Sequence, residues 1–322
     1  MRGLLSPGAT VFLTAPASPV TEEQARQGVA ALEHLGFSVQ TGQSLSESCR
    51  GYAAGTPQAR GAELNRAFAD PAVDAVWCAR GGYTAASVLP FLDYPRISCH
   101  PKPFIGYSDI TALHAALNQY SGLVTWHGPM ACSDLAARPE PGTLDCLGEM
   151  LMSGGVRLYR NPDGSSLQVL RPGRAEGITV GGNLTVFCSL LGTRWMPETA
   201  GRILFLEEVD EPVPAVERLL GQLERAGVFY RAAGVLLGCF TRCENRYCAE
   251  YDVNALLRDF FCRFPIPVTG GLECGHCSPT GTLPLGALCR MDEGQIQFFP
   301  ANSPPAIQPM EGKYSERDDY LS

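Results

Sequence analysis

Short apolar runs alternate with longer amphipathic stretches over the first 130 residues. Residues 10–16 (TVFLTAP) form an apolar run that ends in proline and predicts a buried strand. A helix is expected from Thr21 to Leu35, where apolar residues recur at helical spacing and Gly36 follows. Thr21 and Gln24 can form a capping box at its start. The pattern continues with a strand at 37–39, a helix at 57–69, strand–turn–helix units at 74–92 and 103–117, and a strand at 123–130. This alternation predicts an α/β fold with a parallel sheet covered on both faces.

The chain changes character after residue 133. Residues 133–176 are rich in Pro, Gly and Arg and show little periodicity, which is typical of a link between domains. From residue 177 the pattern resumes, with a strand at 202–211, a helix at 213–227, a strand at 234–240 and short strands and turns at 267–299. With 322 residues, two domains are expected. The predicted organisation is an N-terminal α/β domain at 1–135, a linker region at 136–176, a C-terminal domain at 177–300 and a polar tail at 301–322.

The charge and composition of the chain argue against some classes of binding partner and favour one cellular compartment. The 25 Lys and Arg against 33 Asp and Glu give a net charge of −8, which argues against nucleic acid as a partner. No apolar run approaches the length of a transmembrane helix. Ser6-Pro7-Gly8 interrupts the N-terminal apolar stretch, so a signal peptide is not expected. The thirteen cysteines are scattered through a large chain, which favours reduced thiols and a cytoplasmic protein.

Ser108 lies at a predicted strand-to-helix turn, and this position allows two interpretations. A hydroxyl beside the free N–H groups of a helix start can attack a carbonyl while those groups hold the oxyanion. Alternatively, Ser108 or Asp109 simply caps the helix that begins near Ile110. The Gly-x-Ser-x-Gly motif of α/β-hydrolases is absent.

Two acidic residues, Glu207 and Glu208, end the apolar run Ile203–Leu206. Such a run is typical of a strand buried on both faces, and ligands bind beyond the carboxyl ends of such strands. Adjacent strand residues point to opposite faces, so only one of the two carboxylates can face a given site. The alternative is a pair of solvated carboxylates at a strand exit.

Five histidines are present, and His276 is the one in a loop rich in glycine. This position suits a catalytic role. His34 and His114 fall within predicted helices, His100 in a loop, and His127 at a strand end where it could line a pocket. Cys274 and Cys277 flank His276, but neither they nor the cluster Cys239, Cys243 and Cys248 show the paired spacing of a zinc site, and no metal is expected.

Five segments together resemble the LD-carboxypeptidases, also called muramoyltetrapeptide carboxypeptidases, a family of serine peptidases. They occur in the family's order and spacing and span the chain from about Thr10 to Phe299. They are ARGGYTAASVLPFLDY (79–94), FIGYSDITALH (104–114), GGNLTVFCSLLGT (181–193), LFLEEVDEPVPAVERLLGQL (204–223) and GLECGHCSPTGTLPLG (271–286).

The resemblance implies a Ser–Glu–His triad of Ser108, Glu207 and His276, with Glu208 as a bystander. It implies an oxyanion hole formed by the backbone N–H groups of Gly82 and Asp109. The implied fold is an N-terminal parallel-sheet domain of the flavodoxin or class I glutamine amidotransferase type and a smaller C-terminal β-rich domain. The site would then form where the two domains meet.

The family cleaves an amide between an L-centre and a D-amino acid, typically releasing D-alanine from murein tetrapeptide during peptidoglycan recycling in the cytoplasm. The resemblance also implies a homodimer. Such an enzyme must bind a free carboxylate, for which Arg80 is a candidate, although it could equally form a structural ion pair. Tyr83 and His127 are further candidate substrate contacts. No cofactor is expected.

Three alternatives remain open at this stage. Related proteins cleave a peptidyl-nucleotide antibiotic and confer immunity. The chain could also be a catalytically silent protein that binds muropeptides, although the intact triad positions argue against this. Finally, Cys274 and Cys277 could serve a thiol- or metal-dependent enzyme.

Overall fold

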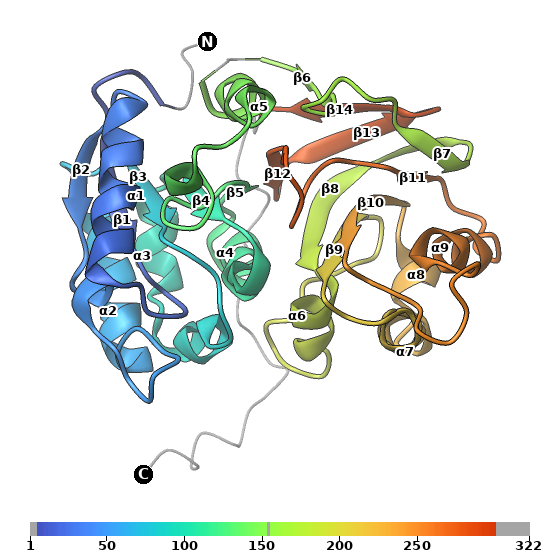
Figure 1. The fold of residues 1–322 in the computed structure, drawn as a ribbon, viewed down its shortest axis with the longest axis horizontal. Helices are drawn as coiled ribbons and strands as arrows, with labels where there is room; N and C mark the ends of the chain where they lie inside the picture. The colour runs from blue at the N-terminus through green and yellow to red at the C-terminus, as the bar shows by residue number, and fades with distance from the viewer. Residues whose placement is uncertain (1–4, 153–154, 301–322) are drawn as a thin grey trace.

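Two halves, each built on its own β-sheet, lie side by side in the computed structural model, which describes residues 5–152 and 155–300 (Figure 1). The predicted polar tail at 301–322 lies outside these residues. The sheet of the first half has the strand order β12-β5-β4-β3-β1-β2. Strands β1 to β5 are mutually parallel, which confirms the expected fold class. Their bounds are β1 Thr10–Thr14, β2 Ser38–Thr41, β3 Ala75–Cys78, β4 Phe104–Gly106 and β5 Thr125–His127.

Helices cover both faces of this sheet because its strands are apolar on both sides. On β3, Trp77 faces one buried cluster together with Leu32 of α1, whereas Val76 faces another with Phe68 of α2. Helix α1 begins with the predicted capping box between Thr21 and Gln24. The helices of this half are α1 Glu22–His34, α2 Pro57–Ala69, α3 Tyr94–Cys99 and α4 Thr111–Ser121, with 3-10 helices at Gln43–Ser46, Ala85–Phe91, Ser108–Ile110 and Leu135–Ala137.

The second half is a mixed sheet with the strand order β6-β14-β13-β8-β9-β10-β11-β7. The central strands β8 to β11 are parallel, and the outer strands pair antiparallel. The strands are β6 Arg157–Leu158, β7 Gln168–Arg171, β8 Arg174–Asn183, β9 Ile203–Val209, β10 Gly234–Thr241, β11 Val268–Gly270, β13 Leu288–Asp292 and β14 Gln295–Phe299. Helices α6 Leu184–Ser189, α7 Val213–Arg225, α8 Val228–Arg231 and α9 Val253–Phe261 pack against one face.

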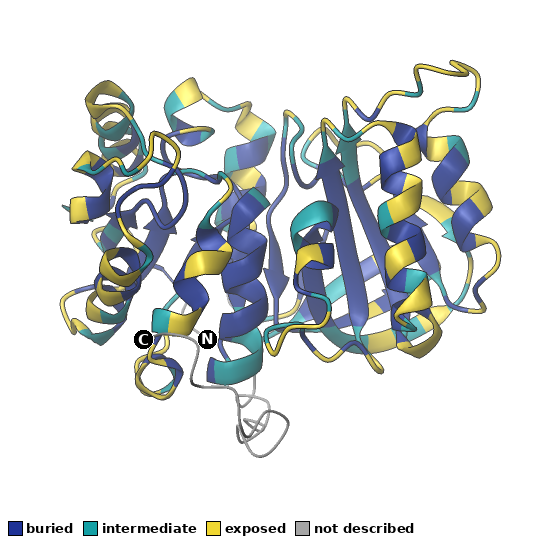
Figure 2. Cartoon of the chain, turned by 90° about the horizontal axis from the view of Figure 1, so that it is seen from below, coloured by how far each residue is buried: buried dark blue, intermediate teal, exposed yellow. Residues whose placement is uncertain are grey.

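One strand of the C-terminal part of the chain belongs to the N-terminal sheet. Strand β12, Leu283–Leu285, pairs antiparallel with β5, so that Leu283 lies opposite His127. A single buried cluster runs across this junction and includes Trp126, Leu283 and Phe205. Figure 2 shows that the strands of both sheets are buried, while the outer surfaces of the helices are exposed. The two halves therefore share a core as well as a sheet.

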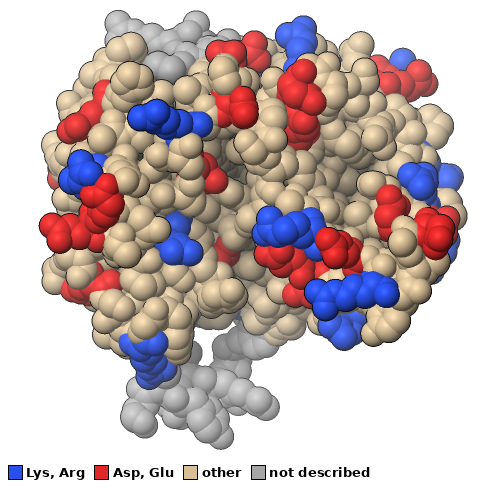
Figure 3. Space-filling model, in the orientation of Figure 1, with Lys and Arg blue, Asp and Glu red and all other residues tan. Residues whose placement is uncertain are grey.

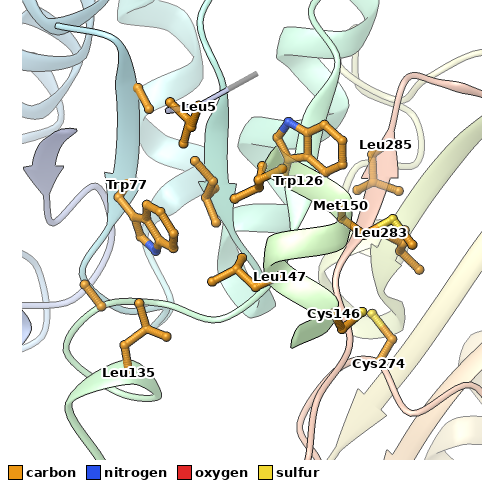
Figure 4. Close-up of a cluster of buried hydrophobic side chains, with 14 of the residues drawn as sticks. Leu5, Trp77, Trp126, Leu135, Cys146, Leu147, Met150, Cys274, Leu283 and Leu285 are labelled. Carbon is orange, nitrogen blue, oxygen red and sulfur yellow. The ribbon is translucent and has the colours of Figure 1, made fainter. Parts of the chain in front are cut away.

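Helix α5, Pro141–Met152, lies in the stretch for which a linker was expected. Its proline, two glycines and threonine dilute the helical pattern, because these residues have low helix propensity. Tertiary packing supports the helix instead: Leu147 and Met150 are buried, and Figure 4 shows their helix between Trp77 and the strand that carries Leu283. The same stretch supplies strands β6 and β7, so it is mostly structured. In the described parts of the chain, no helix is long and apolar enough to cross a membrane.

Candidate active site

Ser108 lies at a sharp turn between β4 and α4. Its φ is +67°, in the left-handed region that non-glycine residues rarely adopt, at a cost of about 1–3 kcal/mol. Neither Ser108 nor Asp109 caps α4, because its N-cap is Ile110 and no side chain bonds there, so the capping interpretation is wrong. The turn holds the Ser108 side chain close to Gly81, where a Cβ would lie only 3.0 Å from the Ser108 Oγ.

Ser108, His276 and Glu207 form a continuous chain of hydrogen bonds. The His276 Nε2 lies 3.0 Å from the Ser108 Oγ, and the His276 Nδ1 lies 2.8 Å from the Glu207 Oε2. Because a carboxylate only accepts, Nδ1 carries the proton and Nε2 is free to accept one from the hydroxyl. Ser108 follows β4 of the N-terminal sheet, Glu207 lies on β9, and His276 lies in the loop between β11 and β12. Both halves of the molecule therefore contribute to this cluster.

The two neighbouring carboxylates of β9 have separate environments. Glu207 is completely buried beneath His276. Glu208 points to the other face and accepts hydrogen bonds from Asn183 Nδ2 at 2.8 Å and from the Thr185 backbone N–H and hydroxyl at 2.8 and 2.6 Å. The prediction that only one of them can face the site holds in this structure. The alternative of two solvated carboxylates is wrong, because both are buried.

Burial and hydrogen bonding set the charge states of the pair. Burial raises the pKa of Glu207, although the hydrogen bond to His276 opposes this rise. Burial alone would lower the pKa of His276, but the hydrogen bond and charge of Glu207, together with the charges of Asp134 and Glu208, raise it, and the net effect is a raised pKa. The protein thus stabilises the protonated imidazole that forms when His276 accepts a proton.

The Gly81-Gly82 turn lies against Ser108 and the amide of Asp109. A Cβ on Gly81 would be 3.4 Å from the Asp109 nitrogen, so this glycine permits the close approach of the two segments. Two buried side chains hold the segment that follows. The Asp109 carboxylate accepts the N–H of Ala85 at 2.8 Å, and Arg60 Nη1 donates to the Thr84 carbonyl and hydroxyl at 3.2 and 3.0 Å. The sequence does not predict this role of Arg60, because its partners are carbonyl and hydroxyl groups distant along the chain.

The three predicted substrate contacts differ in their environments. Arg80 is half-buried and forms no ion pair among the described residues, which leaves its charge available to a ligand. Tyr83 is 88% exposed beside the Gly-Gly turn. His127 is only 1% exposed, and its ring packs against Tyr107 and Phe205, so the prediction that it lines a pocket is corrected. Neither the contact with Phe205 nor the pairing of β5 with β12 can be predicted from the local sequence.

The sequence predicts no role for two further residues near His276, Tyr107 and Asp134. The Tyr107 ring packs edge-on against His276 with ring centroids 4.8 Å apart, and its hydroxyl donates to Asp134 Oδ1 at 3.0 Å. Tyr107 directly precedes Ser108, and this adjacency was the available signal. No sequence pattern indicates that Asp134 lies near His276, because it is distant from the triad along the chain.

All thirteen cysteines are free thiols. Burial raises the pKa of Cys274, which keeps this thiol protonated and unreactive. Within residues 5–152 and 155–300, no three His, Cys, Asp or Glu side chains converge in a way that could hold a metal ion. On the face shown in Figure 3, acidic and basic side chains intermix and uncharged atoms cover most of the surface.

Comparison with known proteins identifies the family. Residues 11–128 match the model of the LD-carboxypeptidase N-terminal domain, and residues 176–291 match that of the C-terminal domain. A Bacillus subtilis protein named "Probable murein peptide carboxypeptidase" is 36% identical over 298 residues, covering 90% of this chain and 91% of its own. The chain belongs to the LD-carboxypeptidase family.

Two further relatives of this LD-carboxypeptidase-family chain carry different names. A Pseudomonas aeruginosa "Murein tetrapeptide carboxypeptidase" is 31% identical over 298 residues, covering 89% of this chain and 94% of its own. The solved structure of MccF in complex with glutamyl sulfamoyl guanosine superposes with a TM-score of 0.84 at 28% identity, covering 93% of this chain and 98% of that one. The shared fold is a mostly parallel N-terminal sheet followed by a mixed C-terminal sheet, as the resemblance implied.

Proposed function

We propose that this protein is a serine carboxypeptidase that hydrolyses an L,D amide bond and releases the terminal D-alanine of murein tetrapeptide in peptidoglycan recycling. The observation that carries the proposal is the hydrogen-bonded chain of Ser108, His276 and Glu207. A strained serine, a histidine and a buried carboxylate in this order are the parts of a nucleophilic triad. Relatives named as murein peptide carboxypeptidases support the substrate class.

In the proposed reaction, the Ser108 Oγ attacks the carbonyl carbon of the L,D amide and gives its proton to His276 Nε2. Glu207 holds the Nδ1–H and stabilises the imidazolium. The carbonyl oxygen becomes an oxyanion that accepts from the backbone N–H groups of Gly82 and Asp109. The C–N bond then breaks as His276 returns the proton to the leaving amine. Water, activated by the same histidine, hydrolyses the acyl-enzyme and regenerates Ser108.

Substrate selection requires a partner for the free carboxylate of the terminal residue. Arg80 lies next to the Gly-Gly turn and has no competing ion pair in the described structure, so we assign it this role. The exposed ring of Tyr83 would contact the peptide from the same turn. The proposal also includes a cytoplasmic homodimer, which cell fractionation and sedimentation equilibrium would test.

The experiment that tests the activity compares the wild type with Ser108→Ala and with Ser46→Ala, an exposed serine outside the site. Each purified protein is incubated with murein tetrapeptide, and free D-alanine is measured. The wild type and Ser46→Ala are expected to release D-alanine, and Ser108→Ala is expected to lose nearly all turnover. Release by Ser108→Ala would contradict the serine mechanism.

The likeness to MccF, which is named a microcin C7 self-immunity protein and was solved in complex with glutamyl sulfamoyl guanosine, favours a second candidate, a peptidase that cleaves a peptidyl-nucleotide and confers immunity. If the wild type releases no D-alanine, a peptidyl-nucleotide becomes the next substrate to test. Binding of the tetrapeptide without turnover of either substrate would instead indicate a catalytically silent muropeptide-binding protein.

A further inference from the structure

A second carboxylate, Asp134, is linked to His276 through the ring of Tyr107. The Tyr107 ring meets the imidazole at an interplanar angle of 60°, with centroids 4.8 Å apart. Its hydroxyl donates to Asp134 Oδ1 at 3.0 Å. The reaction steps described above use neither side chain.

Three donors bind the carboxylate of Asp134, and each favours its anionic form. Besides the Tyr107 hydroxyl, the Met130 backbone N–H and the Ser133 hydroxyl donate to its Oδ2 at 2.8 and 2.9 Å. Burial raises the pKa of Asp134, and the three hydrogen bonds and the charge of His276 oppose this rise. Burial, reinforced by the charge of Asp134, raises the pKa of Tyr107 far above its usual value. The phenol therefore stays neutral and remains the donor.

We propose that Tyr107 and Asp134 are positioning residues that fix the imidazole of His276 and stabilise its protonated form during catalysis. The inference rests on the proposed function and deepens it. The hydrogen bond from Nδ1 to Glu207 fixes the direction of the His276 imidazole within the plane of that ring. The Tyr107 ring packs against the imidazole and limits its rotation about the axis of this hydrogen bond. Asp134 in turn fixes the Tyr107 ring by binding its far end.

The electrostatic part of the proposal follows from the charged and titratable groups around His276. These are Glu207 and Glu208 of β9, Asp210 after β9, Asp134 before the 3-10 helix at Leu135–Ala137, Tyr107 after β4, His127 of β5 and Cys277 of its own loop. Burial lowers the pKa of His127 far below its usual value, so it adds no positive charge near neutral pH. Asp210 is exposed and paired with Arg242, which neutralises it. Asp134 is thus the nearby carboxylate outside β9 that is partly buried and lacks a cationic partner among the described side chains.

The experiment measures the pKa of His276 by NMR in the wild type, Asp134→Asn, Tyr107→Phe and Asp210→Asn. With five histidines in the chain, the His276 resonance is assigned from its loss in His276→Gln. Asp134→Asn is expected to lower the pKa of His276 by up to about one unit, equivalent to a tenfold change in the protonation equilibrium. Tyr107→Phe keeps the ring and should cause a smaller shift. Asp210→Asn, the matched control, should leave the pKa unchanged.

Kinetics complete the test. In Asp134→Asn the acid limb of the kcat profile should move to lower pH, and kcat on its plateau should fall while KM stays near the wild-type value. A role confined to stability would lower the melting temperature without moving the pKa of His276. An unchanged pKa in both Asp134→Asn and Tyr107→Phe overturns the inference, and if Asp134→Asn does not fold, Tyr107→Phe decides alone. The NMR titration needs no substrate, so a failure of the proposed peptidase activity would be seen separately.

Discussion

Gly275→Ala should reduce turnover by displacing the carboxylate that orients His276. Gly275 has a φ of +120°, and a Cβ there would lie 2.7 Å from Glu207 Oε2, the oxygen that His276 binds. It would also lie 2.9 and 3.0 Å from the Cγ and Cβ of Glu207, so the carboxylate cannot simply rotate away. Ordinary contacts of a Cβ begin at 3.4 Å, so the two groups must separate by 3.4 − 2.7 = 0.7 Å.

A misplacement of 1 Å in a catalytic group can cost about 10²-fold in rate, so a 0.7 Å displacement should lower kcat by roughly 10- to 100-fold. The assay is D-alanine release from murein tetrapeptide, with the melting temperature measured in parallel. Because alanine is also strained at positive φ, the variant should lose about 1–2 kcal/mol of stability as well.

Gly192→Ala is the matched control for that strain. Gly192 has a φ of +79°, and a Cβ there would meet no atom within 4 Å. Both variants should unfold at lower temperature than the wild type, but only Gly275→Ala should lose turnover. A folded Gly275→Ala protein with the kcat of Gly192→Ala would refute the reasoning.

Three other predictions concern the same centre. Glu207→Gln should lower kcat by about 10³- to 10⁴-fold. Glu208→Gln should lower the free energy of unfolding in urea by about 1–3 kcal/mol and leave kcat nearly unchanged, and the opposite result would exchange the roles of the two residues. kcat/KM should rise with pH through one ionisation above the ordinary histidine value of 6.5, because His276 must be neutral to accept the proton and Glu207 raises its pKa; a limb below 6.5 would contradict this. Cys277→Ser should keep D-alanine release close to that of the wild type, and a complete loss would favour thiol chemistry.

Local patterns in the sequence are sufficient to predict the elements that are stabilised by residues close together along the chain. The capping box of Thr21 and Gln24 begins α1 as predicted, and the apolar runs mark the parallel strands. The turn at Ser108 was predicted because strand, turn and helix follow one another without interruption. The resemblance to the LD-carboxypeptidases predicts Glu207, and not Glu208, as the carboxylate of the triad. Spacing along the strand alone does not distinguish the two.

The remaining features depend on contacts between residues that are far apart along the chain. Helix α5 has weak propensity and forms because its apolar side chains pack at the junction of the two halves. His127 looked available for substrate because nothing nearby in sequence reveals that Leu283 pairs opposite it. Asp134 approaches the triad only through Tyr107, in an arrangement that no local pattern records.

The pairing of β12 with β5 has a consequence for the order of biosynthesis. The ribosome synthesises β1 to β5 long before Leu283–Leu285. The outer edge of β5 therefore stays unpaired until nearly the whole chain has been made. Exposed edges recruit other strands, and N-terminal regions usually fold first during synthesis. A fragment that stops before β12 should therefore associate with itself, and adding the missing C-terminal part in trans should return it to solution.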